Sequence, residues 1–149
     1  MTPITLATLN HERIAMSHFL KIQTQIRERE QLLSALRELH FQHQVSPNQA
    51  NDLLVRGYRG NQERAEVVVD TGCAYDIGFQ RKTEGYEVVA DWWGVQGNSR
   101  IRQVEFIQQV NRQYAYNVIR DQVREQNLVV EEERTLENGD VVITLSERG

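Results

Sequence analysis

Arginines, aromatic residues and aspartates gather around three glycine-containing stretches in the middle third of this 149-residue sequence. The stretches are Val55–Gly60 (Val-Arg-Gly-Tyr-Arg-Gly), Tyr75–Phe79 (Tyr-Asp-Ile-Gly-Phe) and Ala90–Val95 (Ala-Asp-Trp-Trp-Gly-Val). Arginine and tyrosine can stack on nucleobases and contact phosphates, and tryptophan can extend such a platform. An exposed tryptophan can equally anchor a protein interface, with arginines donating hydrogen bonds around it. We therefore expect a binding surface in this region.

The arginine-containing turn at Val55–Gly60 has two interpretations. It is a contact for nucleic acid, or it is a tight reversal that glycine permits and arginine merely solvates. The formal net charge of −4 and the lack of a basic run disfavour broad contact with a phosphate backbone. No Gly-Lys-Ser/Thr sequence follows the glycines, so they match no phosphate-binding loop. We therefore expect neither nucleic-acid binding nor nucleotide hydrolysis as the main function.

Asp76 and Asp91 are the carboxylates of these stretches. If their strands are neighbours, the two side chains can form a pair suited to acid–base chemistry. Alternatively, each accepts hydrogen bonds from turn amides or pairs with Arg56 or Arg59. We favour this second interpretation, because two carboxylates at an unknown separation match no catalytic arrangement.

Histidine and cysteine give little support for metal or thiol chemistry. His40 and His43 are three residues apart, which suits two ligands on one helix face, but the helix is expected to end between them. Cys73 is the single cysteine, so it has no internal disulfide partner, and no histidine or cation beside it in sequence would activate it. We therefore expect a reducing compartment, no metal, no cofactor and no catalytic residue.

Trp92 and Trp93 are adjacent in a segment that we expect to end a strand. Neighbouring side chains of a strand point to opposite faces, so one tryptophan should be buried and the other exposed. Tyr116, in the second predicted helix, points away from the apolar stripe and either covers the helix flank or meets a partner. The candidate partner surface therefore comprises Arg56, Tyr58, Arg59, Asp76, Asp91, Trp92, Trp93 and Tyr116.

Hydrophobic periodicity predicts the elements that must position these residues. Alternation over Phe19–Ile26 predicts a half-buried strand, and leucines at helical spacing between 32 and 39 predict a helix that ends near His40. Residues 42–52 have no period and are expected to form a surface loop. Four short strands should follow between Leu53 and Trp92, among them a central strand at 65–70 that contains the valines at 67–69.

A longer helix and a hairpin are predicted for the last third of the chain. The apolar stripe of the helix runs from Val104 to Val123, and Asn127 lies near its C-terminal cap. The hairpin joins residues 128–134 to 141–145 through a turn at Asn138-Gly139. The element order is β-α-β-β-β-β-α-β-β, which predicts an α+β fold with a mainly antiparallel sheet and two helices packed on one face. The other face would be polar or available to a partner.

Length and composition fit a single soluble domain. Hydrophobic residues make up 40% of the chain and charged residues 26%, which lies near globular averages. No segment approaches the ~20 apolar residues of a membrane span, and the first residues lack the apolar core of a secretion signal. Residues 1–15 show neither a period nor a cap, so we expect a poorly ordered extension followed by one α+β domain at 16–149.

Five motifs in order resemble one known family. They are Met16–Phe19, Val55–Gly60, Tyr75–Phe79, Val89–Asp91 and Gln113–Tyr116. Together they look like the hypothetical chloroplast open reading frame thirty-five family, a domain of unknown function in cyanobacteria and algal plastids. The resemblance runs from about residue 16 to residue 146, and family members begin at the first motif, which sets residues 1–15 apart. It implies a cyanobacterial cytoplasm or a plastid stroma and supplies no reaction.

Three functions follow from these observations as hypotheses. The first, which we favour, is a non-catalytic interaction or accessory module that binds another protein, with a homo-oligomer left open. The second is a small-molecule or single-stranded nucleic-acid binding domain that uses the Arg56-Tyr58-Arg59 turn and the Trp92-Trp93 region. The third is an enzyme with residues spread over the strands, which would need a closed polar pocket with perturbed carboxylates.

Overall fold

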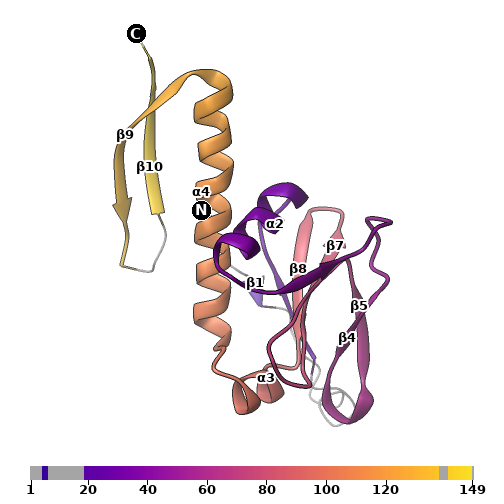
Figure 1. Ribbon diagram of the computed structural model, residues 1–149. Coiled ribbons are helices and arrows are strands. Elements are labelled where there is room, and N and C mark those ends of the chain that lie inside the picture. The colour runs from indigo at the N-terminus through magenta and orange to yellow at the C-terminus, as the bar shows by residue number, and fades with distance from the viewer. Residues whose placement is uncertain (1–4, 7–18, 138–140, 149) are drawn as a thin grey trace.

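A six-stranded sheet forms the centre of the computed structural model, which describes residues 5–6, 19–137 and 141–148 (Figure 1). Its strands, in spatial order, are β1 (Thr5–Leu6), β2 (Leu20–Gln23), β8 (Gly85–Ala90), β7 (Ile77–Lys82), β6 (Val67–Val69) and β3 (His43–Val45). Every pairing in this sheet is antiparallel. The prediction of an α+β fold with a mainly antiparallel sheet is therefore confirmed.

Two helices cover one face of the sheet, as expected. They are α2 (Arg29–Glu38) and α4 (Gln103–Gln126), which lie side by side. The apolar stripe of α2, including Leu36, and that of α4, including Phe106, are buried in one cluster with sheet residues such as Phe79. Each such side chain contributes about 1.5–3 kcal/mol when fully buried, so this layer carries the main core.

The opposite face of the sheet is covered by a hairpin, which corrects the expectation of a polar or open face. β4 (Leu53–Arg56) pairs with β5 (Gln62–Ala65), and Val55 of this hairpin packs with Val68 of the sheet in a second, smaller core. Gly78 on β7 permits the close approach, because a Cβ atom there would lie 2.6 Å from Cγ2 of Val55. Figure 1 shows the hairpin beside the sheet, on the side away from α4.

The segment expected to be a loop at 42–52 contains the edge strand β3, so this part of the prediction is wrong. Three residues are too few for an apolar period to be visible in the sequence. The predicted central strand at 65–70 is also divided, because β5 ends at Ala65 in the hairpin and β6 begins at Val67 in the main sheet. Glu66 stands at the point where the chain changes sheets.

Trp92 and Trp93 begin a helix and do not end a strand, which corrects the sequence prediction. α3 covers Trp92–Asn98, and the side chain of Asp91 accepts a hydrogen bond from Gly94 N at 3.2 Å. An aspartate at this position is a strong helix start signal, because its oxygen satisfies a backbone amide that has no partner within the helix.

The predicted C-terminal helix and hairpin are confirmed. α4 ends at the C-cap Asn127, which adopts the left-handed conformation at φ 53°. β9 (Leu128–Thr135) and β10 (Val141–Glu147) form a separate two-stranded sheet alongside α4, and Figure 1 shows it on the side away from the main sheet. The turn expected at Asn138-Gly139 lies outside the described residues.

Residues 1–15 are described only at Thr5 and Leu6, which pair with Gln23 and Ile22 of β2. The other residues of this stretch lie outside the described ranges, so its poor order stays a prediction. None of the described helices combines the length and the apolar character that crossing a bilayer requires.

Candidate interaction surface

Arg56 and Asp76 form a bidentate ion pair at the end of β4. Arg56 Nε donates to Asp76 Oδ2 and Arg56 Nη2 donates to Asp76 Oδ1, both at 2.9 Å. The backbone N of Arg56 also donates to Oδ2 at 2.9 Å, while Asp76 N donates to the Arg56 carbonyl at 3.1 Å. The hydrogen bonds and charge of Asp76 raise the pKa of Arg56. This pair ties the hairpin to the loop before β7, and Asp76 is buried within it.

Asp91 is fully buried and joins two backbone segments. Its Oδ1 caps α3 at Gly94, and its Oδ2 accepts a hydrogen bond from Tyr58 N at 3.1 Å. Tyr58 opens the short 3-10 helix η1 (Tyr58–Gly60) that connects β4 to β5. Asp76 therefore pairs with Arg56, and Asp91 accepts hydrogen bonds from backbone amides. Both contacts are of the structural kind that the sequence favours over an acid–base pair.

Tyr58, Arg59 and Trp93 form what we call the aromatic–arginine patch. The rings of Tyr58 and Trp93 meet edge to face, with centroids 5.9 Å apart and an interplanar angle of 89°. The Arg59 guanidinium lies over the Tyr58 ring, 5.1 Å from its centroid. Trp93 is 68% exposed. Asp91 accepts hydrogen bonds from both η1 and the first turn of α3. The backbone segments that carry the three side chains are therefore fixed to each other.

Arg59 adopts a backbone conformation that side chains rarely take. Its φ of 53° and ψ of 38° lie in the left-handed region, which costs a residue other than glycine roughly 1–2 kcal/mol. Strain of this kind persists where the surroundings enforce it, and it is more frequent at functional sites. The conformation places Arg59 beside Tyr58 on the outside of the turn.

Trp92 and Tyr116, two of the five candidate residues outside the patch, belong to other contacts. Trp92 is 4% exposed and packs in the main core, with its ring centroid 5.9 Å from that of Phe106. Tyr116 on α4 donates a hydrogen bond to Glu133 on β9, and this bond is the main cause of its raised pKa. Tyr116 therefore belongs to the contact between α4 and the C-terminal hairpin.

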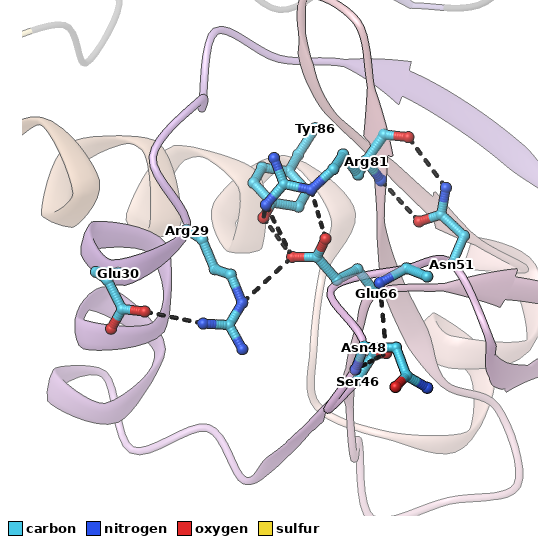
Figure 2. A network of polar contacts seen from close by, with 9 residues as sticks. Arg29, Glu30, Ser46, Asn48, Asn51, Glu66, Arg81 and Tyr86 are labelled. Carbon is cyan, nitrogen blue, oxygen red and sulfur yellow. Dashed lines mark hydrogen bonds and ion pairs between the residues drawn. The ribbon is translucent and has the colours of Figure 1, made fainter.

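A buried carboxylate network was not predicted from the sequence. Glu66 is fully buried, and its carboxylate accepts hydrogen bonds from Arg81 Nε and Tyr86 Oη, each at 2.5 Å (Figure 2). Arg29 Nε, at the start of α2, lies 3.6 Å from Glu66 Oε2. A glutamate between Ala65 and a run of three valines was the available signal, since a charge in a buried strand needs partners.

The electrostatics of this network keep Glu66 ionised. Burial raises the pKa of Glu66, but hydrogen bonds from Arg81 and Tyr86 and the charges of Arg81 and Arg29 lower it more, so the net pKa is below its usual value. Burial and the hydrogen bond to Glu66 raise the pKa of Tyr86. A carboxylate held in its charged form donates no proton at neutral pH. We therefore interpret the network as the structural link between α2, β7 and β8.

The backbone around the network is tied in the same way. Asn51 Oδ1 accepts from Arg81 N at 2.8 Å and Asn51 Nδ2 donates to Arg81 O at 3.0 Å (Figure 2). Ser46 N donates to Glu66 O at 2.8 Å. The segment after β3 is thereby fixed to the sheet.

The side chains of His43 and Cys73 are engaged in local contacts. His43 Nδ1 lies 2.8 Å from the carbonyl of Phe41, and Cys73 Sγ lies 3.1 Å from Thr71 Oγ1. Across residues 5–6, 19–137 and 141–148, no group of three or more histidine, cysteine, aspartate or glutamate side chains is placed to hold a metal ion.

The fold and the patch define an α+β domain with a braced, exposed aromatic surface. A family model described as "Protein of unknown function (DUF1257)" matches residues 35–144, and the chain belongs to this family. The matched range runs from α2 to β10 and includes all eight candidate residues.

Two relatives place the family in algal plastids. The chain is 30% identical over 136 residues to "Uncharacterized protein ycf35" of Guillardia theta, covering 87% of this chain and 96% of that protein. It is 31% identical over 110 residues to the protein of the same name in Cyanophora paradoxa, covering 72% of this chain and 78% of the relative. No solved structure matches the chain. The comparisons confirm the resemblance read from the motifs.

Proposed function

We propose that this protein is a non-catalytic interaction module that binds another protein through the aromatic–arginine patch. The observation that carries the proposal is the position of Trp93, which is 68% exposed on a helix whose first turn is capped by a buried aspartate. Tryptophan is among the residues most enriched at the energetic centres of protein interfaces.

The energetics of Trp93 support this use. A tryptophan side chain presents about 150–250 Å² of surface, so covering its exposed part would contribute roughly 3 kcal/mol at about 25 cal/mol per Å². The Tyr58 ring and the Asp91 cap hold the neighbouring backbone and side chain in place. A surface ordered before binding loses less conformational entropy on association.

Arg59 sets the chemistry expected of the partner. Its guanidinium stacks on Tyr58 and carries five N–H donors at the edge of the patch. Arginine in this setting binds carboxylates and carbonyl groups with defined geometry. The proposed partner is therefore a protein with an apolar socket for Trp93 and an acidic or carbonyl group next to it.

The proposed setting is the cytoplasm of a cyanobacterium or the stroma of a plastid. The relatives from Guillardia theta and Cyanophora paradoxa support a plastid or cyanobacterial origin. The single cysteine supports a compartment in which thiols stay reduced.

The alternative of a nucleic-acid or small-molecule ligand has weaker support. The rings of Tyr58 and Trp93 are perpendicular, and the Tyr58 face is occupied by Arg59, so the patch does not offer two parallel rings for successive bases. The net charge of −4 adds no electrostatic attraction for a phosphate backbone.

A quantitative pull-down tests the proposal. Tagged parent protein is compared with Trp93→Ala, Arg59→Ala and the control Val104→Ala, which truncates another strongly exposed side chain. A cyanobacterial lysate is the source of partners, and mass spectrometry counts the captured proteins. We expect one stoichiometric protein that the parent and Val104→Ala retain and Trp93→Ala loses. Capture of the same proteins by Trp93→Ala and the parent would contradict the proposal.

A further inference from the structure

A groove of about 360 Å³ runs between the edge strand β3 and the hairpin strand β4. The residues that line it include His43, Gln44, Leu54, Arg56, Val68 and Asp70. Leu54 is 42% exposed, whereas Val68 is buried, so the groove has an apolar wall and floor. Arg56 borders the groove two residues before Tyr58 of the aromatic–arginine patch, but the groove itself is a separate surface.

The backbone of β3 presents unpaired hydrogen-bonding groups at this place. Ser46 N donates to the Glu66 carbonyl and Asp70 N donates to the Gln42 carbonyl, so the backbone groups of Gln42, Gln44 and Ser46 point toward β6. In an antiparallel ladder the alternate residues point the other way. The N–H and C=O groups of His43 and Val45 therefore face away from β6. Within the described part of the chain β3 pairs with β6 alone, so no strand lies on that side of β3.

The hairpin contributes a second outward-facing backbone position. Gly57 N donates to the Asn61 carbonyl, which fixes the ladder register of β4 and β5. By the same alternation, the backbone groups of Leu54 point away from β5. Both walls of the groove thus carry backbone groups of the kind that an extended chain satisfies.

The charge at one end of the groove is negative. Asp76 is neutralised by the bidentate contact with Arg56. Asp70 is exposed and its Oδ1 accepts only the local hydrogen bond from Gly72 N at 2.8 Å among the described contacts. Asp70 has no ion pair within 4 Å in the described residues. This end of the groove therefore favours a positively charged side chain.

We propose that an extended segment of a partner protein docks along the open edge of β3, beside this groove, and adds there as a further strand of the sheet. One apolar side chain of the segment lies against the exposed Leu54 at the rim of the groove, and a lysine or arginine side chain two residues along reaches toward Asp70. Strand addition draws its affinity from main-chain hydrogen bonds and its selectivity from alternate side chains. The proposal rests on the groove and not on the patch.

Binding of a designed peptide to the full chain tests this site. The probe is an end-capped nine-residue peptide with threonine at the odd positions and valine, lysine, valine and lysine in turn at the even positions, so that valine and lysine share one face. It is titrated while amide hydrogen exchange is followed residue by residue. We expect saturable binding and exchange at the His43 and Val45 amides slowed by about tenfold or more, since these donors become bonded. A version N-methylated along one edge, which has the same charge but no donors there, should not slow them.

Two further comparisons separate this site from general attraction to an acidic protein. A peptide with glutamate in place of lysine, and the variant Leu54→Lys, should each weaken binding by about tenfold or more through like-charge contacts. Leu136→Lys makes the same change at another exposed leucine and should bind as the parent does. Trp93→Ala should also bind as the parent does, which separates this site from the proposed function.

Several results would overturn the proposal. Equal binding of the N-methylated peptide would show that the strand edge is not used, and unchanged affinity of Leu54→Lys would place the peptide elsewhere. Absence of saturable binding up to about 1 mM would leave too little affinity for a specific site. Concentration-dependent protection of His43 and Val45 without peptide would assign the edge to a second copy of this chain.

Discussion

Two arginine clusters of similar composition lie in opposite surroundings. In the network, Arg81 and Arg29 face the buried carboxylate of Glu66 and the hydroxyl of Tyr86. In the patch, Arg59 stacks on Tyr58 beside the exposed Trp93, and the carboxylate of Asp91 accepts hydrogen bonds from the backbone amides of Tyr58 and Gly94. The network directs its charges at each other, whereas the patch directs its arginine and its largest ring at solvent.

The difference indicates whether the interactions of each cluster stabilise the fold or are available for binding. A buried carboxylate that accepts hydrogen bonds from neighbouring side chains holds elements together and has little left to offer a ligand. An exposed aromatic ring contributes little to folding, so its contribution is available for association. We therefore expect substitutions in the network to change stability, and substitutions in the patch to change binding.

A large loss of stability is expected for Glu66→Gln. Removing the charge leaves Arg81 without its carboxylate partner and Arg29 with Glu30 alone, and breaking a buried pair costs roughly 3 kcal/mol of unfolding free energy. Glu30→Gln removes an exposed partner of Arg29 and should cost under about 0.5 kcal/mol. Urea unfolding curves measure both. Equal midpoints for the two variants would show that the network does not hold the fold.

Acid also distinguishes the parent from Glu66→Gln. Because the pKa of Glu66 is lowered in the folded state, its contribution is present above the unfolded-state pKa and is lost as pH falls through the folded-state pKa. The parent should therefore lose more stability than Glu66→Gln when the pH is lowered from about 7 to about 3. Parallel pH profiles of the two proteins would contradict the lowered pKa.

The tryptophan pair provides the most direct comparison of core and patch. Trp92→Ala should cost about 3 kcal/mol or more, because it opens a cavity beside Phe106. Trp93→Ala should stay within about 0.5 kcal/mol of the parent while abolishing partner capture. Thermal melting and the pull-down measure the two effects. A large loss of stability in Trp93→Ala would mean that the exposed ring supports the fold.

Much of the fold could be predicted from the sequence, because long apolar periods survive without knowledge of contacts. The stripe of α4 and the alternation before α2 gave the helices and the first strand. β3 could not be predicted, since three residues carry no period, and Trp92–Trp93 was assigned to a strand because the capping role of Asp91 was missed. The partners of Glu66 come from α2, β7 and β8, and only the folded chain brings them together.

An intermediate effect is expected for Tyr86→Phe. Losing one hydrogen bond to Glu66 should cost about 1–2 kcal/mol at neutral pH. The pKa of Tyr86 is raised in the folded state, so its contribution is present below the unfolded-state value of about 10 and is lost as pH rises toward the folded-state pKa. Stability of the parent should thus fall above about pH 10, and Tyr86→Phe should fall less. Urea unfolding midpoints of the parent and Tyr86→Phe, measured from neutral pH to above about pH 10, test this expectation.

The smallest expected effect has the opposite sign and concerns Arg59→Gly. Arg59 occupies the left-handed region at φ 53°, which glycine adopts without strain, so the substitution should stabilise the protein by about 0.5–1 kcal/mol. Arg59→Ala lacks this freedom and serves as the matched control, because it removes the same side chain and keeps the strain. Both variants should weaken partner capture, since both lose the guanidinium over Tyr58. Unfolding curves and the pull-down together separate the two roles of Arg59. A glycine variant less stable than the alanine variant would show that the turn is unstrained, and undiminished capture by both would restrict the interaction surface to Trp93 and Tyr58.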